Sequence, residues 1–205
     1  MVVVLISGRG SNLHALLEAG VPVSAVISNR GDAQGLEFAA AHGIATRVIE
    51  HVRFASREVF DAALEQEIER FQPRLVALAG FMRLLTPQFV AHYAGRLLNI
   101  HPSLLPAFPG LHTHERALAA GVKVHGCTVH FVTDALDHGP IVIQAAVPVR
   151  AADTADSLAA RALREEHVIY PRAVHWFLDD RLVIESGVVR VKGNDAQLLV
   201  PSDRL

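Results

Sequence analysis

The sequence predicts an α/β fold, with a doubly wound, mostly parallel sheet in the N-terminal half that continues into an antiparallel C-terminal part. Three observations support this. Short apolar segments alternate with helical segments as far as about residue 100. The alternation then gives way to a proline-rich loop and two longer strand-like segments joined by a turn. The length of 205 residues suits one domain of this kind.

In the N-terminal half, every expected strand is short and apolar, and every expected helix repeats its apolar residues at helical spacing. Strands are expected at residues 2–6, 23–28, 46–49, 75–79 and 97–100. Helices are expected at residues 11–19, 35–42, 56–71 and 86–93. Ser11 and Ser56 are predicted N-caps, Val59 is assigned to the apolar side of its helix, and Pro87 suits a first turn. Strict alternation of this kind is typical of a parallel sheet.

In the C-terminal half, an irregular loop is expected at residues 102–112, and a short helix at 112–120. The strands expected at 126–132 and 141–147 are joined by a turn and should pair antiparallel. Asp153 is the predicted N-cap of a long helix that ends near residue 178, and a terminal hairpin should turn at Ser186 and Gly187. The change of pattern near residue 100 indicates two halves of one domain.

Composition narrows the class of partner. The chain has 19 basic and 21 acidic residues, which argues against a nucleic-acid groove. Cys127 is the single cysteine, lies in an apolar strand-like run, and is interpreted as a core residue in a reducing compartment. The apolar run at the N-terminus is too short for a signal peptide or a membrane span. We therefore expect a cytoplasmic protein that binds small molecules rather than nucleic acid or membrane.

The most informative motif is Asn99-Ile-His101-Pro-Ser, read together with Asp137. Residues two apart on a strand point to the same side, so Asn99 and His101 can face one reacting centre. A donating amide, a proton-shuttling imidazole and an orienting carboxylate suit acyl transfer through a tetrahedral intermediate. The alternative for Asp137, in a turn with Gly139 and Pro140, is that it caps local backbone N–H groups.

A second motif, Ser7-Gly-Arg-Gly-Ser-Asn12, falls between the first expected strand and helix. Glycines there let backbone N–H groups approach an anion at a helix N-terminus. The dinucleotide fingerprint is not met, because Leu13 stands where its third glycine would fall, and no Gly-Lys-Ser/Thr follows. A single phosphate therefore fits better than a dinucleotide, and an ordinary capped turn is the alternative.

Three further features are weaker. Twelve histidines suggest metal binding, but neither the His112/His114 pair nor the His125/His130 pair has a zinc-site spacing, and no metal is expected. The segment from Gly80 to Leu85 follows a wholly apolar strand and either walls a ligand pocket or caps the core. Glu166 shares a helix face with apolar residues, so it either points inward or belongs to a solvated acidic pair.

These motifs, in this order, resemble the glycinamide ribonucleotide formyltransferases of purine biosynthesis, which use 10-formyltetrahydrofolate. The resemblance extends from residue 2 to about residue 185. The stretches that carry it are 6–13, 78–83, 92–106, 108–114, 125–134 and 166–171. It implies a formyltransferase fold with a Rossmann-like sheet, and a single domain over residues 1–205. Residues 1–100 would form the phosphate-binding half, and residues 101–205 the folate and catalytic half.

The resemblance also implies roles. The catalytic residues would be Asn99, His101 and Asp137. The ribonucleotide-binding residues would be Gly10, Ser11, Asn12, Gly110 and Glu166. The folate-binding residues would be Arg57, Met82, Arg83, Leu84, Leu85 and Asp137. The co-substrate would be 10-formyltetrahydrofolate, with no metal. The amine would attack the formyl carbon, Asn99 and protonated His101 would stabilise the oxyanion, and Asp137 would assist proton transfer.

Two positions depart from the family pattern. His138 stands where glycine is usual, which implies a loss of conformational freedom beside Asp137, and Arg9 replaces a residue that is often small and polar. Two other functions remain open. One is a 10-formyltetrahydrofolate hydrolase, whose usual N-terminal regulatory domain has no room before the first strand. The other is a non-catalytic phosphate-binding module, which would need no catalytic trio.

Overall fold

The computed structural model describes residues 1–200. The chain divides into two compact units, residues 1–99 and the residues from 100 onward, and each is described by itself. The division falls inside strand β5 (Leu97–His101), at almost the same place as the change of pattern in the sequence. Residues 201–205 of the expected domain lie outside the described residues.

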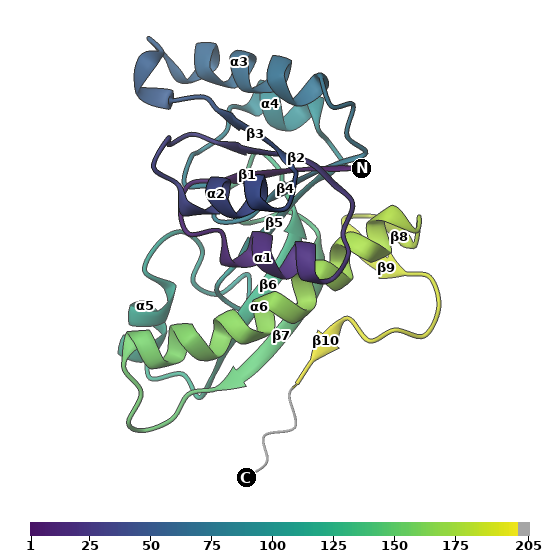
Figure 1. The fold of residues 1–205 in the computed structure, drawn as a ribbon. Helices are drawn as coiled ribbons and strands as arrows, with labels where there is room; N and C mark the ends of the chain where they lie inside the picture. Colours follow the sequence, from purple (N-terminus) through teal and green to yellow (C-terminus); the bar gives the residue numbers. More distant parts are fainter. Residues whose placement is uncertain (201–205) are drawn as a thin grey trace. The chain divides into compact units, whose positions relative to one another are not determined.

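The first unit is a parallel sheet with the strand order β5-β4-β1-β2-β3 (Figure 1). Its strands are β1 (Val2–Ile6), β2 (Val23–Ser28), β3 (Ala45–Val48), β4 (Leu75–Leu78) and β5. The chain first winds outward from β1 to β3 and then returns to the other side of β1 through β4. The order therefore reverses between β1 and β4, which is where open α/β sheets bind ligands, beyond the carboxyl ends of the strands. The doubly wound prediction is confirmed.

The helices of this unit are α1 (Ser11–Glu18), α2 (Gln34–Ala41), the 3₁₀ turn η1 (His51–Arg53), α3 (Arg57–Glu69) and α4 (Pro87–His92). The Ser56 side chain accepts from the Val59 N–H, and Pro87 opens α4, both as predicted. The prediction that Ser11 caps α1 is wrong. Gly10 is the N-cap, with φ 77°, so Ser11 becomes the first helical residue. Val59 is also exposed rather than buried.

The start of helix α4 is fixed by its N-cap and by a hydrogen bond to a side chain of another helix. Thr86 is its N-cap and accepts from the Phe89 N–H, while the Thr86 N–H itself donates to Asp61 of α3 at 2.6 Å. Strands β1 and β4 are buried along their whole length, as expected for strands of a parallel sheet. The loops that follow these two strands therefore start from a rigid base.

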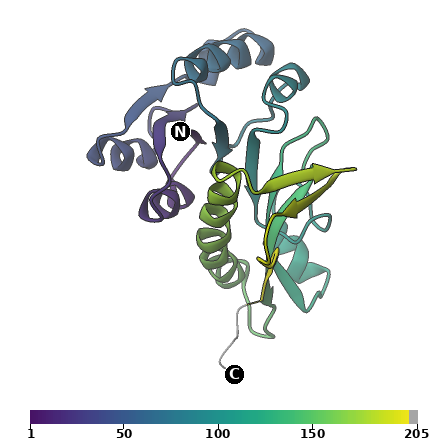
Figure 2. The same ribbon diagram turned by 90° about the vertical axis from the view of Figure 1, so that its right-hand side faces the viewer.

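The second unit is built on an antiparallel pair, β6 (Val124–Phe131) and β7 (Ile141–Pro148), as predicted. Helix α6 (Ala155–Leu178) packs on both strands, and Figure 2 shows it in green alongside them. The remaining elements are α5 (Thr113–Ala119), the hairpin β8 (Leu182–Glu185) and β9 (Val188–Val191), and β10 (Leu198–Leu199). The hairpin was predicted. Strand β10, which pairs parallel with β7, was not, because two residues carry no periodicity.

The prediction that Asp153 caps the long helix is wrong by one residue. Thr154 is the N-cap and forms a capping box with Ser157. The Asp153 carboxylate is drawn away by Arg161, which donates two hydrogen bonds of 2.7 Å, and this pairing holds the pKa of Asp153 well below its usual range. Within residues 1–200, no helix is long and apolar enough to cross a membrane.

Candidate active site

Strand β5 carries the first two predicted catalytic residues. Leu97, Leu98 and Ile100 are buried, which anchors the strand, while Asn99 is partly exposed and His101 is 6% exposed. Because side chains alternate along a strand, Asn99 and His101 lie on the same face of β5. The spacing read from the sequence therefore corresponds to a real strand end.

In the second unit, His101 lies beside Asp137. The His101 Nδ1 atom is 3.5 Å from the Asp137 Oδ2 atom, and the His101 Nε2 atom is 3.1 Å from the carbonyl oxygen of Phe108. Both ring nitrogens thus face oxygen atoms that accept hydrogen bonds. The side chains of His101 and Asp137 are only 7% and 9% exposed, so the pair is largely shielded from water.

The Asp137 carboxylate is not a local turn cap. Its Oδ2 atom accepts from the backbone N–H of Gly110 at 2.8 Å, across 27 residues of sequence. Asp137 itself has φ 54°, a left-handed conformation that aspartate tolerates better than most residues. The turn thus points the carboxylate at the loop after β5. The resemblance implies that Gly110 binds the ribonucleotide, but in this structure its N–H donates to Asp137.

The turn also explains the departure at His138. The left-handed residue of this turn is Asp137, and His138 has no positive φ, so a histidine there does not strain the backbone. Its Nδ1 atom lies 2.6 Å from the carbonyl oxygen of Leu136, within the turn. Glycine is needed one residue later, because a Cβ atom at Gly139 would lie 1.7 Å from the Phe131 carbonyl oxygen.

A third group at this site, His130 of β6, was considered only as a possible metal ligand. It is 2% exposed, and its Nε2 atom is 3.8 Å from the Asp137 Oδ1 atom, while its Nδ1 atom is 2.9 Å from the Phe131 carbonyl oxygen. Burial lowers the pKa of His130, although the carbonyl and the carboxylate act in the opposite direction. Asp137 therefore lies between His101 and His130. The clue in the sequence was a histidine in an otherwise apolar strand.

Two further histidines from the pairs considered as metal ligands, His114 and His125, form a hydrogen bond with each other. His114 Nδ1 lies 3.1 Å from His125 Nε2, and burial lowers the pKa of His125 to about 4. Among the described residues, no three histidine, cysteine, aspartate or glutamate side chains are placed to hold a metal ion.

Glu166 and Cys127 also lie in this unit. Glu166 is 7% exposed on α6, so it points inward rather than into solvent. Cys127 is fully buried on β6, as predicted, and burial together with the charge of Glu166 raises the pKa of its thiol. The thiol therefore stays protonated and does not act as a nucleophile.

In the first unit, the loop after β1 opens helix α1. The N-cap residue of this helix is Gly10, which has no side chain to cap it. Gly10 packs tightly, because a Cβ atom on it would lie 2.9 Å from the Gly35 Cα atom. Gly35 in turn donates its N–H to the Gly8 carbonyl oxygen at 3.2 Å. Ser11 and Asn12 follow Gly10 on α1, and Arg9 is exposed.

The segment after β4 carries the residues implied in folate binding. Met82 and Leu84 are 69% and 55% exposed, whereas Phe81 is buried. Phe81 therefore caps the core, and the next residues present apolar surface outward. The Arg83 guanidinium lies 6.0 Å from the centre of the Phe60 ring, and its buried Nε atom has no hydrogen-bond partner. Arg57 is exposed at the first residue of α3.

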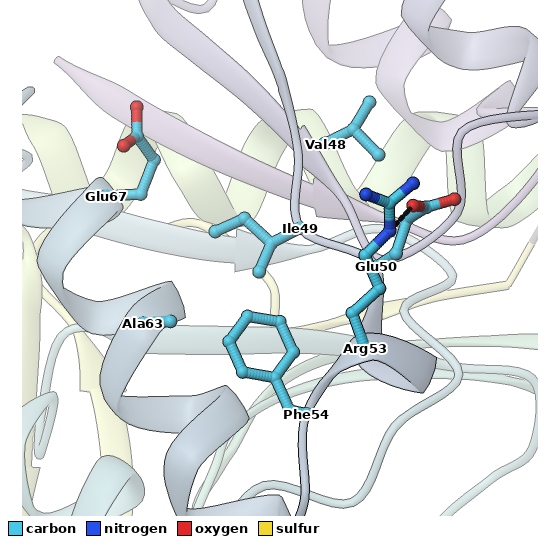
Figure 3. Close-up of a pocket in the computed structure, with 7 residues that line it drawn as sticks. All are labelled: Val48, Ile49, Glu50, Arg53, Phe54, Ala63 and Glu67. Atoms are coloured by element: carbon cyan, nitrogen blue, oxygen red, sulfur yellow. Dashed lines mark ion pairs between the residues drawn. The ribbon is translucent and has the colours of Figure 1, made fainter.

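A separate hollow in this unit is lined by β3, η1 and α3 residues (Figure 3). Its lining residues are Val48, Ile49, Glu50, Arg53, Phe54, Ala63 and Glu67. None of them is a predicted site residue. Its charged side chains form ion pairs, Arg53 with Glu50 and Glu67 with Arg47 and Arg70.

The family model described as formyl transferase matches residues 1–174, so the chain belongs to the formyl transferase family. It is 52% identical to the phosphoribosylglycinamide formyltransferase of Escherichia coli K12, over 94% of this chain and 93% of that protein. A solved phosphoribosylglycinamide formyltransferase from Coxiella burnetii is 46% identical with a TM-score of 0.90, over 97% of each chain. Within the family, the chain is one of the phosphoribosylglycinamide formyltransferases.

A more distant solved structure is also similar. A formyltetrahydrofolate deformylase from Pseudomonas syringae is 28% identical with a TM-score of 0.86, over 93% of this chain and 65% of that one. The fold is thus shared between phosphoribosylglycinamide formyltransferases and a formyltetrahydrofolate deformylase, and the identity to the formyltransferases is the higher of the two.

Proposed function

We propose that this enzyme transfers the formyl group of 10-formyltetrahydrofolate to the primary amine of glycinamide ribonucleotide. The products are formylglycinamide ribonucleotide and tetrahydrofolate. The observation that carries the proposal is the buried His101–Asp137 pair, two residues from Asn99 on β5, in a chain of this family. An amide, an imidazole and a carboxylate are the groups that formyl transfer to an amine requires.

The reaction begins with attack of the amine nitrogen on the formyl carbon. A C–N bond forms, the carbonyl oxygen becomes an oxyanion, and the amine nitrogen becomes positively charged and must lose one of its protons. The Asn99 amide and the His101 imidazolium donate hydrogen bonds to the oxyanion. Asp137 accepts the proton of the amine, directly or through water. The carbonyl then re-forms, the bond between the formyl carbon and N10 of the folate breaks, and N10 takes up a proton.

The hydrogen bonds of His101 indicate which ring nitrogen can donate to the oxyanion. The Phe108 carbonyl oxygen only accepts, so the proton facing it belongs to Nε2, and Nδ1 faces the carboxylate of Asp137. To donate to an oxyanion, Nε2 exchanges the Phe108 carbonyl for the substrate oxygen. The carbonyl thus holds the ring in place until the substrate arrives. Asp137 is itself held by the Gly110 N–H, which keeps the carboxylate aimed at Nδ1.

The binding roles follow the positions of the residues in the fold. Gly10, Ser11 and Asn12 hold the ribonucleotide phosphate at the start of α1, supported by its helix dipole. Glu166 holds the glycinamide end of the ribonucleotide, and Gly110 binds near the same end. Met82, Arg83, Leu84 and Leu85 lie beside the folate, with Asp137 near its pterin end and Arg57 near its tail. The exposed apolar surface of Met82 and Leu84 supports this assignment.

Hydrolysis of 10-formyltetrahydrofolate is the second candidate, because the similar deformylase shows that water can be the acceptor on this fold. A non-catalytic phosphate-binding module is the third. The buried pair of titratable groups at the end of β5 favours an enzyme over a binding module, since a binder gains nothing from holding an imidazole against a carboxylate.

One assay separates these functions. Purified protein is given 10-formyltetrahydrofolate with and without glycinamide ribonucleotide, and tetrahydrofolate and formylated ribonucleotide are measured. We expect both products in equal amounts and only when the ribonucleotide is present. Tetrahydrofolate released at the same rate without it would establish the hydrolase, and no product in either arm would establish the binding module. A cytoplasmic location is part of the proposal, and cell fractionation tests it.

A further inference from the structure

The end of β1 is joined to the segment after β4 through one side chain, Ser7. The Ser7 hydroxyl accepts from the Met82 N–H at 2.8 Å and donates to the Asn29 Oδ1 atom at 2.6 Å. Ser7 is 7% exposed and Asn29 is 4% exposed, so water does not compete for these bonds. In addition, the Ser7 N–H donates to the Gly80 carbonyl oxygen at 3.2 Å.

The direction of these bonds is determined by chemistry. A serine hydroxyl has one proton, and the Asn29 Oδ1 atom can only accept. The Ser7 hydroxyl therefore donates its proton to Asn29. The remaining lone pairs of the hydroxyl are available to the Met82 N–H. The amide of Asn29 is oriented in turn by His51, whose Nδ1 atom lies 3.1 Å from the Asn29 Nδ2 atom. The hydroxyl therefore cannot rotate without breaking a buried hydrogen bond.

The segment that begins at Met82 is irregular, and buried side chains bind its backbone at both ends. Residues 82–85 belong to no helix or strand, and Gly80 turns the chain into them with φ 74°. A side chain fixes the segment at its start, where Ser7 binds the Met82 N–H. A second fixes its end, where the Oδ2 atom of Asp61 accepts from the Thr86 N–H at 2.6 Å. Between these two points, Met82 and Leu84 project apolar surface outward.

The two fixed points differ in what else they touch. Asp61 belongs to α3, which carries no part of the loop between β1 and the start of α1 (residues 8–12), here called the phosphate loop. Ser7 directly precedes Gly8, so a shift of the loop on ribonucleotide binding moves the acceptor of the Met82 N–H. Of the two side chains, Ser7 alone joins both candidate binding segments.

We propose that Ser7 is a positioning residue that couples the two substrate sites, so that ribonucleotide bound at the phosphate loop orders the folate segment through the Met82 N–H. The inference rests on the proposed function, because that function assigns the loop and the segment to the two substrates. Coupling of this kind is reciprocal: each ligand tightens the other by the same factor.

The first test uses the unmodified protein. Hydrogen exchange of the Met82 amide is followed with and without glycinamide ribonucleotide, and no folate is present. We expect the ribonucleotide alone to slow exchange at Met82 by fivefold or more, while the Thr86 amide, held by Asp61, changes less. Unchanged exchange at Met82 under saturating ribonucleotide would overturn the proposal.

The second test measures the coupling itself by calorimetry. Tetrahydrofolate, which has no formyl group to transfer, is titrated into the protein with and without ribonucleotide. In the unmodified enzyme the ribonucleotide should tighten tetrahydrofolate at least about fivefold, within the usual range of such couplings. In Ser7→Ala the factor should fall below about twofold, and Ser7→Thr, which keeps the hydroxyl, should restore it.

Ser28→Ala is the matched control. Ser28 also ends a strand of this sheet and is fully buried, but within residues 1–200 its hydroxyl bonds to the backbone of Arg30 and to no ligand-binding segment. We expect this variant to keep the coupling of the unmodified enzyme. A Ser7→Ala protein that keeps it too, or an unmodified enzyme without coupling, would overturn the proposal. If the unmodified enzyme transfers no formyl group to the ribonucleotide, the proposed function fails instead, and the exchange test still reports on Ser7.

Discussion

The two units build their candidate sites from different materials. In residues 1–99, the groups proposed to meet a ligand are the start of α1, which has glycine as its N-cap, and exposed apolar side chains after β4, both anchored by buried neutral or paired groups such as Ser7. From residue 100 onward, the groups are titratable side chains buried against one another: His101, Asp137 and His130. The first arrangement suits recognition, and the second suits proton transfer. Mutations at the start of α1 should therefore act on affinity, and mutations at His101 and Asp137 on turnover.

The comparison is tested most strongly at His101. In His101→Ala, kcat should fall by about 10²–10⁴-fold, because loss of a positioned acid or base costs that much. Ribonucleotide affinity, measured by calorimetry, should change less than about twofold, since His101 is not among the residues proposed to bind the ribonucleotide. A variant that retains more than about a tenth of the kcat would remove His101 from the chemistry.

Asp137→Asn should come next, with kcat lower by about 10²-fold and the KM for ribonucleotide nearly unchanged. The amide keeps an oxygen for the Gly110 N–H but cannot accept a proton from the amine. An unchanged kcat would mean that Asp137 only shapes its turn.

The control for Asp137 is His138→Gly, which restores the residue usual in the family. His138 bonds within its own turn, so His138→Gly should change kcat less than about twofold relative to its parent, whether that parent is the unmodified enzyme or Asp137→Asn. The imidazole that faces the other carboxylate oxygen is His130. A further fall in the double variant would instead show that His138 shares the proton transfer.

In the first unit, Ser11→Glu should weaken ribonucleotide binding by about 10–100-fold and leave tetrahydrofolate binding unchanged. Ser11 is the first residue of α1, so a carboxylate there places negative charge where the phosphate is expected. Calorimetric titration of each ligand provides the measurement. Equal weakening of both ligands would show that the loop is not a dedicated phosphate site.

The smallest expected effect is on stability at low pH. Burial, aided by the charges of His114 and His101, lowers the pKa of His125 to about 4 in the folded chain from 6.5. Below about pH 6.5, His125 is protonated in the unfolded chain but stays neutral in the folded chain. The free energy of unfolding therefore falls as the pH drops toward 4. This group accounts for a loss on the order of 2–3 kcal/mol.

His125→Phe should remove most of that pH dependence, measured as the difference between urea unfolding free energies at pH 7 and pH 5. His114 and His130, whose pKa values are also lowered by burial, leave a remainder. His138→Gln, at an exposed position, should keep the full pH dependence. A His125→Phe protein with the slope of the unmodified chain would show that His125 is not the group that titrates.

Local patterns determined much of this protein. The alternation of apolar and helical segments predicted the parallel sheet, and the side-chain period of two predicted that Asn99 and His101 share a face of β5. The cap at Ser56, the first-turn Pro87 and the hairpin at Ser186 were also readable, because each depends on residues within four positions of one another.

Only the tertiary structure decided the contacts between distant residues. The Gly110 N–H meets Asp137 across 27 residues, and the Met82 N–H meets Ser7 across 75 residues, and no periodicity reports on such pairs. The two wrong caps have the same origin. Asp153 was drawn to Arg161, and the left-handed Gly10, packed against Gly35, made Ser11 the first helical residue. Local propensity is worth about 1 kcal/mol per position, so packing and charge pairing override it wherever they compete.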